Sequence, residues 1–310
     1  MLMACAIITH PDCLKHEMGA HHPERPQRLG AIEEYITAAD LGKHLVRHEA
    51  PLVTDQQLAR VHPIEYVRAI RDAAPETGTV HLDPDTAMNP HTLDAALRAA
   101  GAAVLATDLV MKDSVKAAFA SVRPPGHHAC RARSMGFCIF NNVAVAAKHA
   151  IAEHGLERVA VIDFDVHHGN GTEDIFEGDP QVLMASTFQH PFYPYSGTED
   201  PAANMFNVPL AAGSGGRELR EAVREIWLPA LDDFRPELIL FSAGFDAHVE
   251  DDMAMLRFVD SDYAWVTREV KAIADRHGKG RIVSVLEGGY ALPALGRSAV
   301  EHLRVLAGLG

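Results

Sequence analysis

Long apolar runs, cysteine pairs and basic residues are all scarce in this chain of 310 residues. No apolar run approaches the roughly 18 residues of a membrane-spanning helix, so we expect no membrane partner. The four cysteines are too few for a disulfide scaffold and form no Cys-x-x-Cys pair, so we expect reduced thiols packed in the interior. Residues 1–8 lack a basic segment and are soon followed by Pro11, which indicates a first strand and not a signal peptide. These absences predict a cytoplasmic protein.

Positive charge is outnumbered, with 28 Lys and Arg against 42 Asp and Glu and a formal charge of -14. The basic residues are scattered, whereas nucleic-acid binding needs a clustered basic face, so we expect no direct nucleic-acid binding. An acidic balance is compatible with a cationic substrate. Histidine is the residue in excess, with 19 copies. Thirteen of these 19 lie outside the motifs described below, and we interpret them as loop or surface residues.

The pattern of apolar segments predicts an α/β fold. The chain has no low-complexity tract, flexible linker or repeat, so we expect one domain over residues 1–310. Apolar runs that end abruptly in polar residues predict buried parallel strands at 115–122, 159–165, 238–243 and 282–286. Helical patterns occur at 93–111, 142–154, 218–234, 262–277 and 295–306. Strands alternating with helices predict an open, mostly parallel sheet flanked by helices, with the active site at the carboxyl ends of the strands.

Metal-ligand side chains follow these predicted strands. Asp163, Asp165 and His167 alternate along one emerging strand, so they should share a face. Asp246, which follows the strand at 238–243, offers another carboxylate. Three nitrogen and oxygen ligands with an open fourth position form the plan of a catalytic zinc site, whereas structural zinc takes four ligands, usually with cysteine. The pattern therefore predicts a catalytic metal at this edge of the sheet.

Amide hydrolysis at a metal also needs a general base, an acid for the leaving amine and a donor for the oxyanion. His127 and His128 follow the strand at 115–122, and Tyr290 follows the strand at 282–286 on a glycine hinge, which matches these needs. A single such residue is more often a helix cap or a solvated loop residue. Here all four predicted strands are followed by side chains of this kind, which favours one shared site. The Gly-x-Ser-x-Gly, Gly-Lys-[Ser/Thr] and His-Glu-x-x-His motifs are missing, which sets aside serine hydrolases, P-loop proteins and zincins.

Motifs along nearly the whole chain resemble those of the histone deacetylase superfamily. They lie at 22–28 (His-Pro-Glu-Arg-Pro-Gln-Arg), 123–128, 136–142, 163–172, 242–248 and 286–290. The resemblance implies an arginase/deacetylase-like α/β fold and zinc-dependent deacetylase activity. Asn170, where class I members carry Asp, and the His-Pro-Glu-Arg-Pro segment are similar to class II members.

The resemblance also implies a set of roles. It implies one zinc ion per chain, held by Asp165, His167 and Asp246. It implies that His128 is the general base and acid and that Tyr290 donates a hydrogen bond to the substrate carbonyl. His127 would be the electrostatic partner of His128. Asp163 would support His127, and Asn170 would support His128. A structural potassium ion is implied near Asp163 and Ser186. His22, His168 and His248 lie inside the motifs without a ligand role.

The substrate-binding residues that the resemblance implies lie around a narrow channel. Phe137 and Tyr193 would line the channel that takes an acyl-lysine, next to Gly136. Asp85 would be the rim carboxylate for the substrate backbone. This chain has Asp252-Met253 where the common pattern of the family has Pro-Leu. Met253 would keep that wall of the channel apolar.

The predicted reaction is hydrolysis of the amide of acetyl-lysine or another acyl-lysine, on a protein, a peptide or a small acylated amine. An acetylpolyamine amidohydrolase is the alternative, although Met253 stands where polyamine-selective relatives carry Glu. A catalytically silent acyl-lysine-binding module is disfavoured because the catalytic and metal positions are intact. An arginase-type enzyme with two manganese ions would need further carboxylates. The physiological substrate, the acyl-chain preference, the native metal and the oligomeric state stay open.

Overall fold

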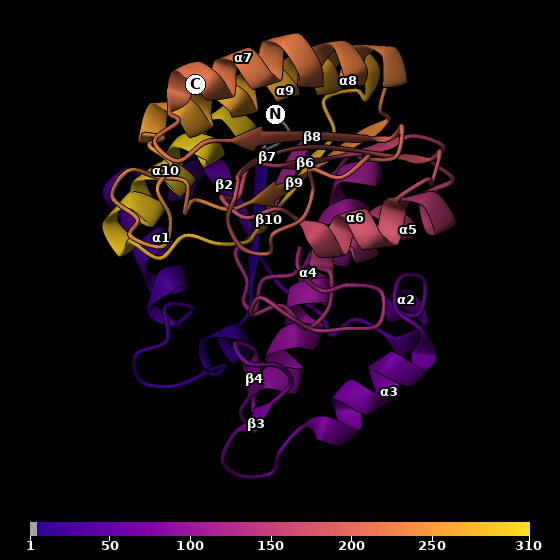
Figure 1. Cartoon of the computed structure of the whole chain (residues 1–310), viewed down its shortest axis with the longest axis vertical. Coiled ribbons are helices and arrows are strands. Elements are labelled where there is room, and N and C mark those ends of the chain that lie inside the picture. The colour runs from indigo at the N-terminus through magenta and orange to yellow at the C-terminus, as the bar shows by residue number, and fades with distance from the viewer. Residues whose placement is uncertain (1–4) are drawn as a thin grey trace.

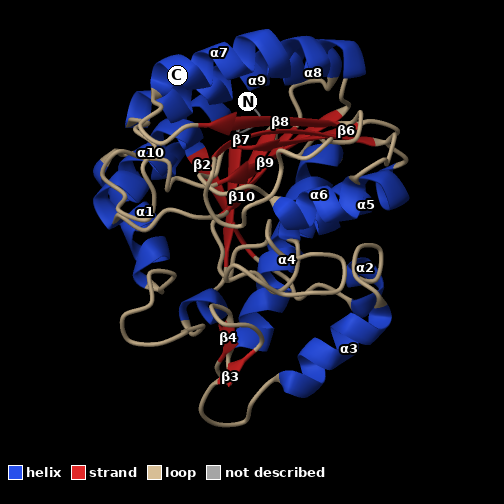
Figure 2. Cartoon of the chain, viewed as in Figure 1, coloured by secondary structure: helices blue, strands red, loops and turns tan. Residues whose placement is uncertain are grey.

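The computed structural model describes residues 5–310 and contains a large parallel sheet (Figures 1 and 2). Its order is β2-β1-β5-β10-β9-β6-β7-β8, and all neighbouring strands run parallel. The strands are β1 (Cys5–Thr9), β2 (Leu45–Glu49), β5 (Ala117–Ala120), β6 (Val159–Asp163), β7 (Val182–Gln189), β8 (Met205–Leu210), β9 (Leu238–Ala243) and β10 (Ile282–Leu286). β3 (Val80–His81) and β4 (Ala87–Met88) form a separate antiparallel pair. The predicted α/β fold with an open parallel sheet is confirmed.

Helices cover both faces of the sheet (Figure 1). One layer contains α1 (Gln27–Ala38), α7 (Gly216–Ala222), α8 (Leu228–Phe234), α9 (Asp260–His277) and α10 (Leu292–Leu306). The other contains α4 (Thr92–Met111), α5 (Asn142–His154) and α6 (Asn170–Phe176). The short helices α2 (Asp55–Leu58) and α3 (Ile64–Ala73) lie away from the sheet, beyond α4. Among residues 5–310, no helix is long and apolar enough to cross a membrane.

The predicted elements match the central part of this fold best. All four predicted strands are present and buried along their whole length, because helices cover both faces. The predicted first strand is confirmed over Cys5–Thr9, whereas residues 1–4 lie outside the described part of the chain. The helix predicted at 218–234 is interrupted by a π-helical turn at Val223–Trp227. Strands β2, β7 and β8 were not predicted.

Buried polar residues correct one prediction and confirm another. The interpretation of thirteen histidines as loop or surface residues is wrong for four of them, His16, His62, His149 and His302, which are buried. Hydrogen bonds explain this burial: His302, for example, contacts the hydroxyls of Thr267 and Ser284 at 2.6 and 2.9 Å. The four cysteines are buried and free, as predicted.

The register of the sheet brings the candidate residues to one edge. Asp163, the last residue of β6, is paired with Ser186 of β7 on one side and Ser242 of β9 on the other. β10 lies on the other side of β9 and ends at Leu286, opposite Ala243. The loops after β6, β9 and β10 therefore leave the sheet side by side, which places the motifs of the sequence within reach of one another.

Candidate active site

Three metal-type side chains meet where β6 and β9 end. Nδ1 of His167 lies 2.9 Å from Oδ1 of Asp165 and 3.3 Å from Oδ2 of Asp246. One ligand atom from each of the three residues lies within 4.8 Å of the others, and all three residues are buried. Asp163 is not part of this group, because β6 ends there and its side chain turns to His127.

The residues of this group fit a divalent cation. Among residues 5–310, no group donates a hydrogen bond to the buried Oδ2 of Asp246, which is costly for a carboxylate unless a cation balances it. Burial and the charge of Asp165 raise the pKa of Asp246 to about 6. Although burial opposes it, the hydrogen bond to Asp165 and the negative charges of Asp246 and Asp165 raise the pKa of His167 to about 9. A set of one imidazole and two carboxylates is the kind of donor set that catalytic zinc takes.

Two histidines from the loop after β5 lie beside this group. Nδ1 of His127 donates to Oδ2 of Asp163 at 3.0 Å, and Nδ1 of His128 donates to Oδ1 of Asn170 at 2.7 Å. The pKa of His128 is held well below its usual value by burial and by the positive charge of its two histidine neighbours. Burial opposes the charge on His127, but the carboxylates of Asp165 and Asp163 raise its pKa well above the usual value. The two rings therefore favour different protonation states.

A narrow cavity of about 160 Å³ leads to these histidines. Every substrate-binding residue proposed from the sequence lines it, namely Asp85, Gly136, Phe137, Tyr193 and Met253, together with Pro125, Phe192, Gly288 and Tyr290. The walls are largely aromatic, with Phe137 edge-on to Tyr290 at 6.1 Å between ring centroids. Phe192 stacks on His167 at 5.4 Å.

The cavity keeps its shape through local backbone constraints. Gly136 has a φ of +57°, and a Cβ there would lie 2.7 Å from Cγ of His128, so only glycine fits beside the histidine ring. Oδ1 of Asp85 accepts a hydrogen bond from the Gly136 N–H at 3.1 Å, which ties the loop that carries Asp85 to the channel wall. Burial and the neighbouring Asp83 raise the pKa of Asp85.

The structure adds residues that the sequence motifs did not single out. Glu287 is buried, and its Oε2 accepts the N–H groups of Gly126 and His127 at 2.6 and 3.1 Å. Its pKa is raised to about 7 by burial, against the charge of His127. The carboxylate of Asp251 accepts hydrogen bonds from the backbone N–H groups of Tyr290 and Met253. Both carboxylates lie inside or beside quoted motifs, but their partners are backbone amides, for which the sequence offers no signal.

A buried network of charged side chains holds the loop that carries Tyr290. Glu24 accepts from Arg28 and from Arg123, and no side chain of the three is exposed. Arg28 also donates to the carbonyl oxygens of Gly289 and Glu287 at 2.6 and 2.5 Å, and its guanidinium lies 5.0 Å from the centre of the Tyr290 ring. The network therefore fixes the glycine segment that precedes the tyrosine.

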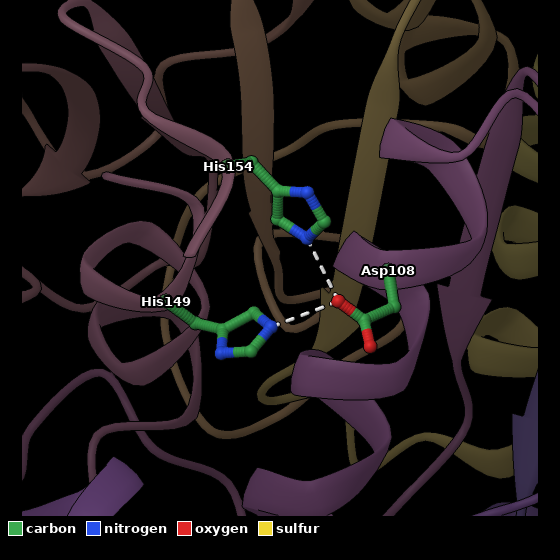
Figure 3. A group of neighbouring side chains, drawn as sticks. All are labelled: Asp108, His149 and His154. Atoms are coloured by element: carbon green, nitrogen blue, oxygen red, sulfur yellow. Dashed lines mark hydrogen bonds and ion pairs between the residues drawn. The ribbon is translucent and has the colours of Figure 1, made fainter. Parts of the chain in front are cut away.

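A second group of metal-type side chains lies between α4 and α5, away from the cavity (Figure 3). Nε2 of His149 and of His154 both point at Oδ1 of Asp108, at 2.9 and 2.8 Å. However, Arg60 donates to Nδ1 of His149 at 2.9 Å, so the neutral ring carries its proton on Nε2, the atom that would have to bind a metal. Metal-bound histidines instead donate from the other ring nitrogen. This group is therefore a hydrogen-bonded link between two helices.

Comparison with known proteins defines the class of this fold and site. The sequence model of the histone deacetylase domain matches residues 22–306, so the chain belongs to the histone deacetylase family, a family of hydrolases. The chain is 38% identical to the histone deacetylase-like amidohydrolase of Pseudomonas aeruginosa, over 92% of this chain and 77% of that protein. It is 34% identical to human polyamine deacetylase HDAC10, over 99% of this chain and 48% of that protein. The crystal structure of the HDA15 HD domain superposes with a TM-score of 0.93 at 34% identity, covering 99% of this chain and 90% of that one.

Proposed function

We propose that the protein hydrolyses the amide of acetyl-lysine, or of another acyl-lysine, and releases the acid and the free amine. One zinc ion per chain would be held by Asp165, His167 and Asp246. The observation that carries this proposal is the buried Oδ2 of Asp246, which lacks a protein donor among residues 5–310 and faces an imidazole and a second carboxylate at the end of an aromatic channel.

The geometry supports a division of labour between the side chains. When bound, zinc supplies a Lewis acid that polarises the amide carbonyl and lowers the pKa of a water molecule. His128 donates through Nδ1 to Asn170, which leaves Nε2 of the neutral ring to accept the proton of the attacking water and then pass it to the leaving amine. His127, paired with Asp163, would stay charged beside it and stabilise the negative charge that develops.

Tyr290 would stabilise the oxyanion. Burial raises the pKa of its phenol well above the usual value, so the hydroxyl keeps its proton and remains a hydrogen-bond donor. The phenol lies in the same cavity as His127, His128 and His167. A donor that is placed before the reaction begins needs no reorganisation when the charge appears.

The cavity favours a thin, extended substrate. Phe137 and Tyr193 line it from two loops, which suits the methylene chain of an acyl-lysine. Met253 keeps another wall apolar, and Asp85 stands at the same cavity, where its carboxylate would hold the substrate backbone.

The test of this proposal is zinc content together with turnover of an acetyl-lysine peptide by the purified protein. Tyr290→Phe and His128→Ala should each abolish most of the turnover while zinc stays bound, because neither residue belongs to the ligand group. Wild-type rates in both variants would show that the assignment of roles is wrong. A protein that binds zinc and acetyl-lysine peptide without turnover would point to a silent binding module.

Acetylpolyamine hydrolysis is the second candidate, and the similarity to a polyamine deacetylase favours it. The chemistry would be the same, with a small cationic amine in place of a lysine side chain. Comparing kcat/KM for an acetyl-lysine peptide and for acetylputrescine separates the two candidates. The apolar Met253 in the cavity wall offers a distal ammonium group no partner, so we expect the peptide to be preferred.

We further propose that the chain acts as one catalytic domain and that a potassium ion supports the loop after β6. Asp163 and Ser186, the residues named for this ion, are neighbours in register on β6 and β7. Oδ1 of Asp163 accepts the N–H of Asp165, so an ion there would brace the segment that carries two of the zinc ligands. Unfolding in potassium and in tetramethylammonium buffers of equal ionic strength tests this: greater stability in potassium is expected, and equal stability would contradict it.

A further inference from the structure

One buried carboxylate outside the metal group ties two walls of the cavity together. Asp251 lies in the segment between β9 and α9 and is 5% exposed. Its Oδ2 accepts the N–H of Tyr290 at 2.6 Å and the N–H of Ala291 at 3.0 Å. Its Oδ1 accepts the N–H of Met253 at 3.1 Å. A single side chain therefore fixes the backbone of the proposed oxyanion donor and the backbone of the apolar wall.

Arg28 holds the carbonyl groups of Glu287 and Gly289, and Asp251 adds an anchor at the amide of the tyrosine itself. The tyrosine follows Gly288 and Gly289, and Gly289 has a φ of +116°, a conformation open to glycine but to few other residues. Two successive glycines allow the loop many conformations, and Ala291, the residue directly before α10, has no side chain that could cap the helix. Hydrogen bonds to a charged acceptor are the stronger kind, and here two of them fall on consecutive amides directly at the tyrosine.

We infer that Asp251 is a positioning residue that holds the phenol of Tyr290 in the geometry needed for turnover and the side chain of Met253 in the wall that binds the substrate. This inference rests on the proposed function, because it assumes that Tyr290 is the oxyanion donor. Asp251 lines no part of the cavity and belongs to neither group of metal-type side chains, so it acts through Tyr290 and not on the substrate.

A double-mutant cycle tests the inference. Asp251→Ala should lower kcat roughly 100-fold, because a displacement of about 1 Å at a reacting group costs that much. In the Tyr290→Phe background the same substitution should cost less than about threefold in kcat, because the group that Asp251 places is already missing. A loss of equal size in both backgrounds would overturn the inference, since it would mean that Asp251 acts through something other than the phenol.

Two further variants separate placement from general damage to the fold. Asp251→Asn keeps one acceptor oxygen, enough for the amides of Tyr290 and Ala291, and meets the Met253 N–H with an amide group that cannot accept. It should retain kcat within about fivefold and raise KM, and a kcat as low as that of the alanine variant would contradict the inference. Asp252→Ala removes the neighbouring exposed carboxylate and should leave kcat, KM and the melting temperature unchanged.

A readout that does not require turnover keeps this inference distinct from the proposed function. In protein labelled with fluorotyrosine, the fluorine resonance of residue 290, assigned by its loss in Tyr290→Phe, should shift or broaden in Asp251→Ala but not in Asp252→Ala. An unchanged resonance would overturn the inference. A wild-type protein that cleaves no acyl amine would overturn the proposed function, while the fluorine experiment would still decide whether Asp251 places Tyr290.

Discussion

Substituting Gly244 with alanine is a direct test of the metal group. Gly244 follows β9, and a Cβ at this position would overlap Oδ2 of Asp165 and lie 2.5 Å from its carboxylate carbon. Real Cβ contacts stay above 3.0 Å, so the carboxylate must retreat by at least about 0.5 Å. Metal sites tolerate only about 0.2 Å in ligand distance. The backbone of Gly244 is not in the left-handed region, so a side chain there causes no backbone strain, and the three atoms nearest to the added Cβ all belong to Asp165.

The expected effect is a loss of zinc-linked stability. If the displaced ligand weakens zinc binding about 100-fold, then at a zinc concentration of roughly 100 times the wild-type Kd the stabilisation by zinc falls from about 2.7 to about 0.4 kcal/mol. Any cost of overpacking, roughly 1–3 kcal/mol, is present with and without zinc and cancels in the difference.

The assay is denaturant unfolding of the metal-free and zinc-loaded proteins, with zinc content measured in parallel. Gly30→Ala, in α1, is the matched control, because a Cβ there meets nothing within 4 Å. We expect Gly30→Ala to keep the full zinc-linked stabilisation and Gly244→Ala to lose most of it. If Gly244→Ala kept both the zinc-linked stabilisation and the zinc content of the wild type, Asp165 would not be a ligand.

Three further predictions concern single side chains. Tyr290→Phe should lower kcat by roughly 10²–10³ with little change in KM, because the hydroxyl is needed only as charge develops; an unchanged kcat would exclude it as the oxyanion donor. Burial opposes ionisation of Glu24, but Arg123 and Arg28 hold its pKa at about 2, against a usual 4.5. Its stabilising contribution of about 3 kcal/mol is therefore complete above pH 4.5 and is lost as the pH falls towards 2, so Glu24→Gln should flatten the dependence of unfolding free energy on pH in that window; an unaltered slope would contradict this. Met253→Glu should raise the ratio of kcat/KM for acetylputrescine over acetyl-lysine peptide roughly fivefold, about 1 kcal/mol for a new ion pair, whereas Met253→Gln should not.

The central strands and the site motifs could both be predicted from the sequence, because both follow from the burial of these strands by helices on both faces. A parallel strand covered by helices on both faces is apolar along its length, as in Val159–Asp163, so the change to polar residues marks its carboxyl end, where the chemistry gathers. The two strands at the edges of the sheet, β2 and β8, lack this signal. In β2 only Leu45 is buried, and β8 contains Pro209, so neither produces a continuous apolar run.

The supporting contacts could not be predicted, because they join residues far apart in the chain. Glu24 and Arg123 are 99 positions apart and meet in the interior, where burial of both charges depends on the pairing. Asp251 bonds to backbone amides, which every residue carries, so no residue type marks its partners. His302 looks like any polar residue until the hydroxyls of Thr267 and Ser284 are known to meet it.

The position of β10 in the sheet has a consequence for the way the chain assembles. β10 (Ile282–Leu286) is the last of the strands in chain order, yet it lies in the middle of the sheet, between β5 and β9. During synthesis, β2-β1-β5 and β9-β6-β7-β8 can pair before β10 leaves the ribosome, but the two halves have no strand to join them. The strand that closes the sheet also delivers Tyr290, so a nascent chain that stops before residue 282 has both an open seam through its core and no phenol to act at the site.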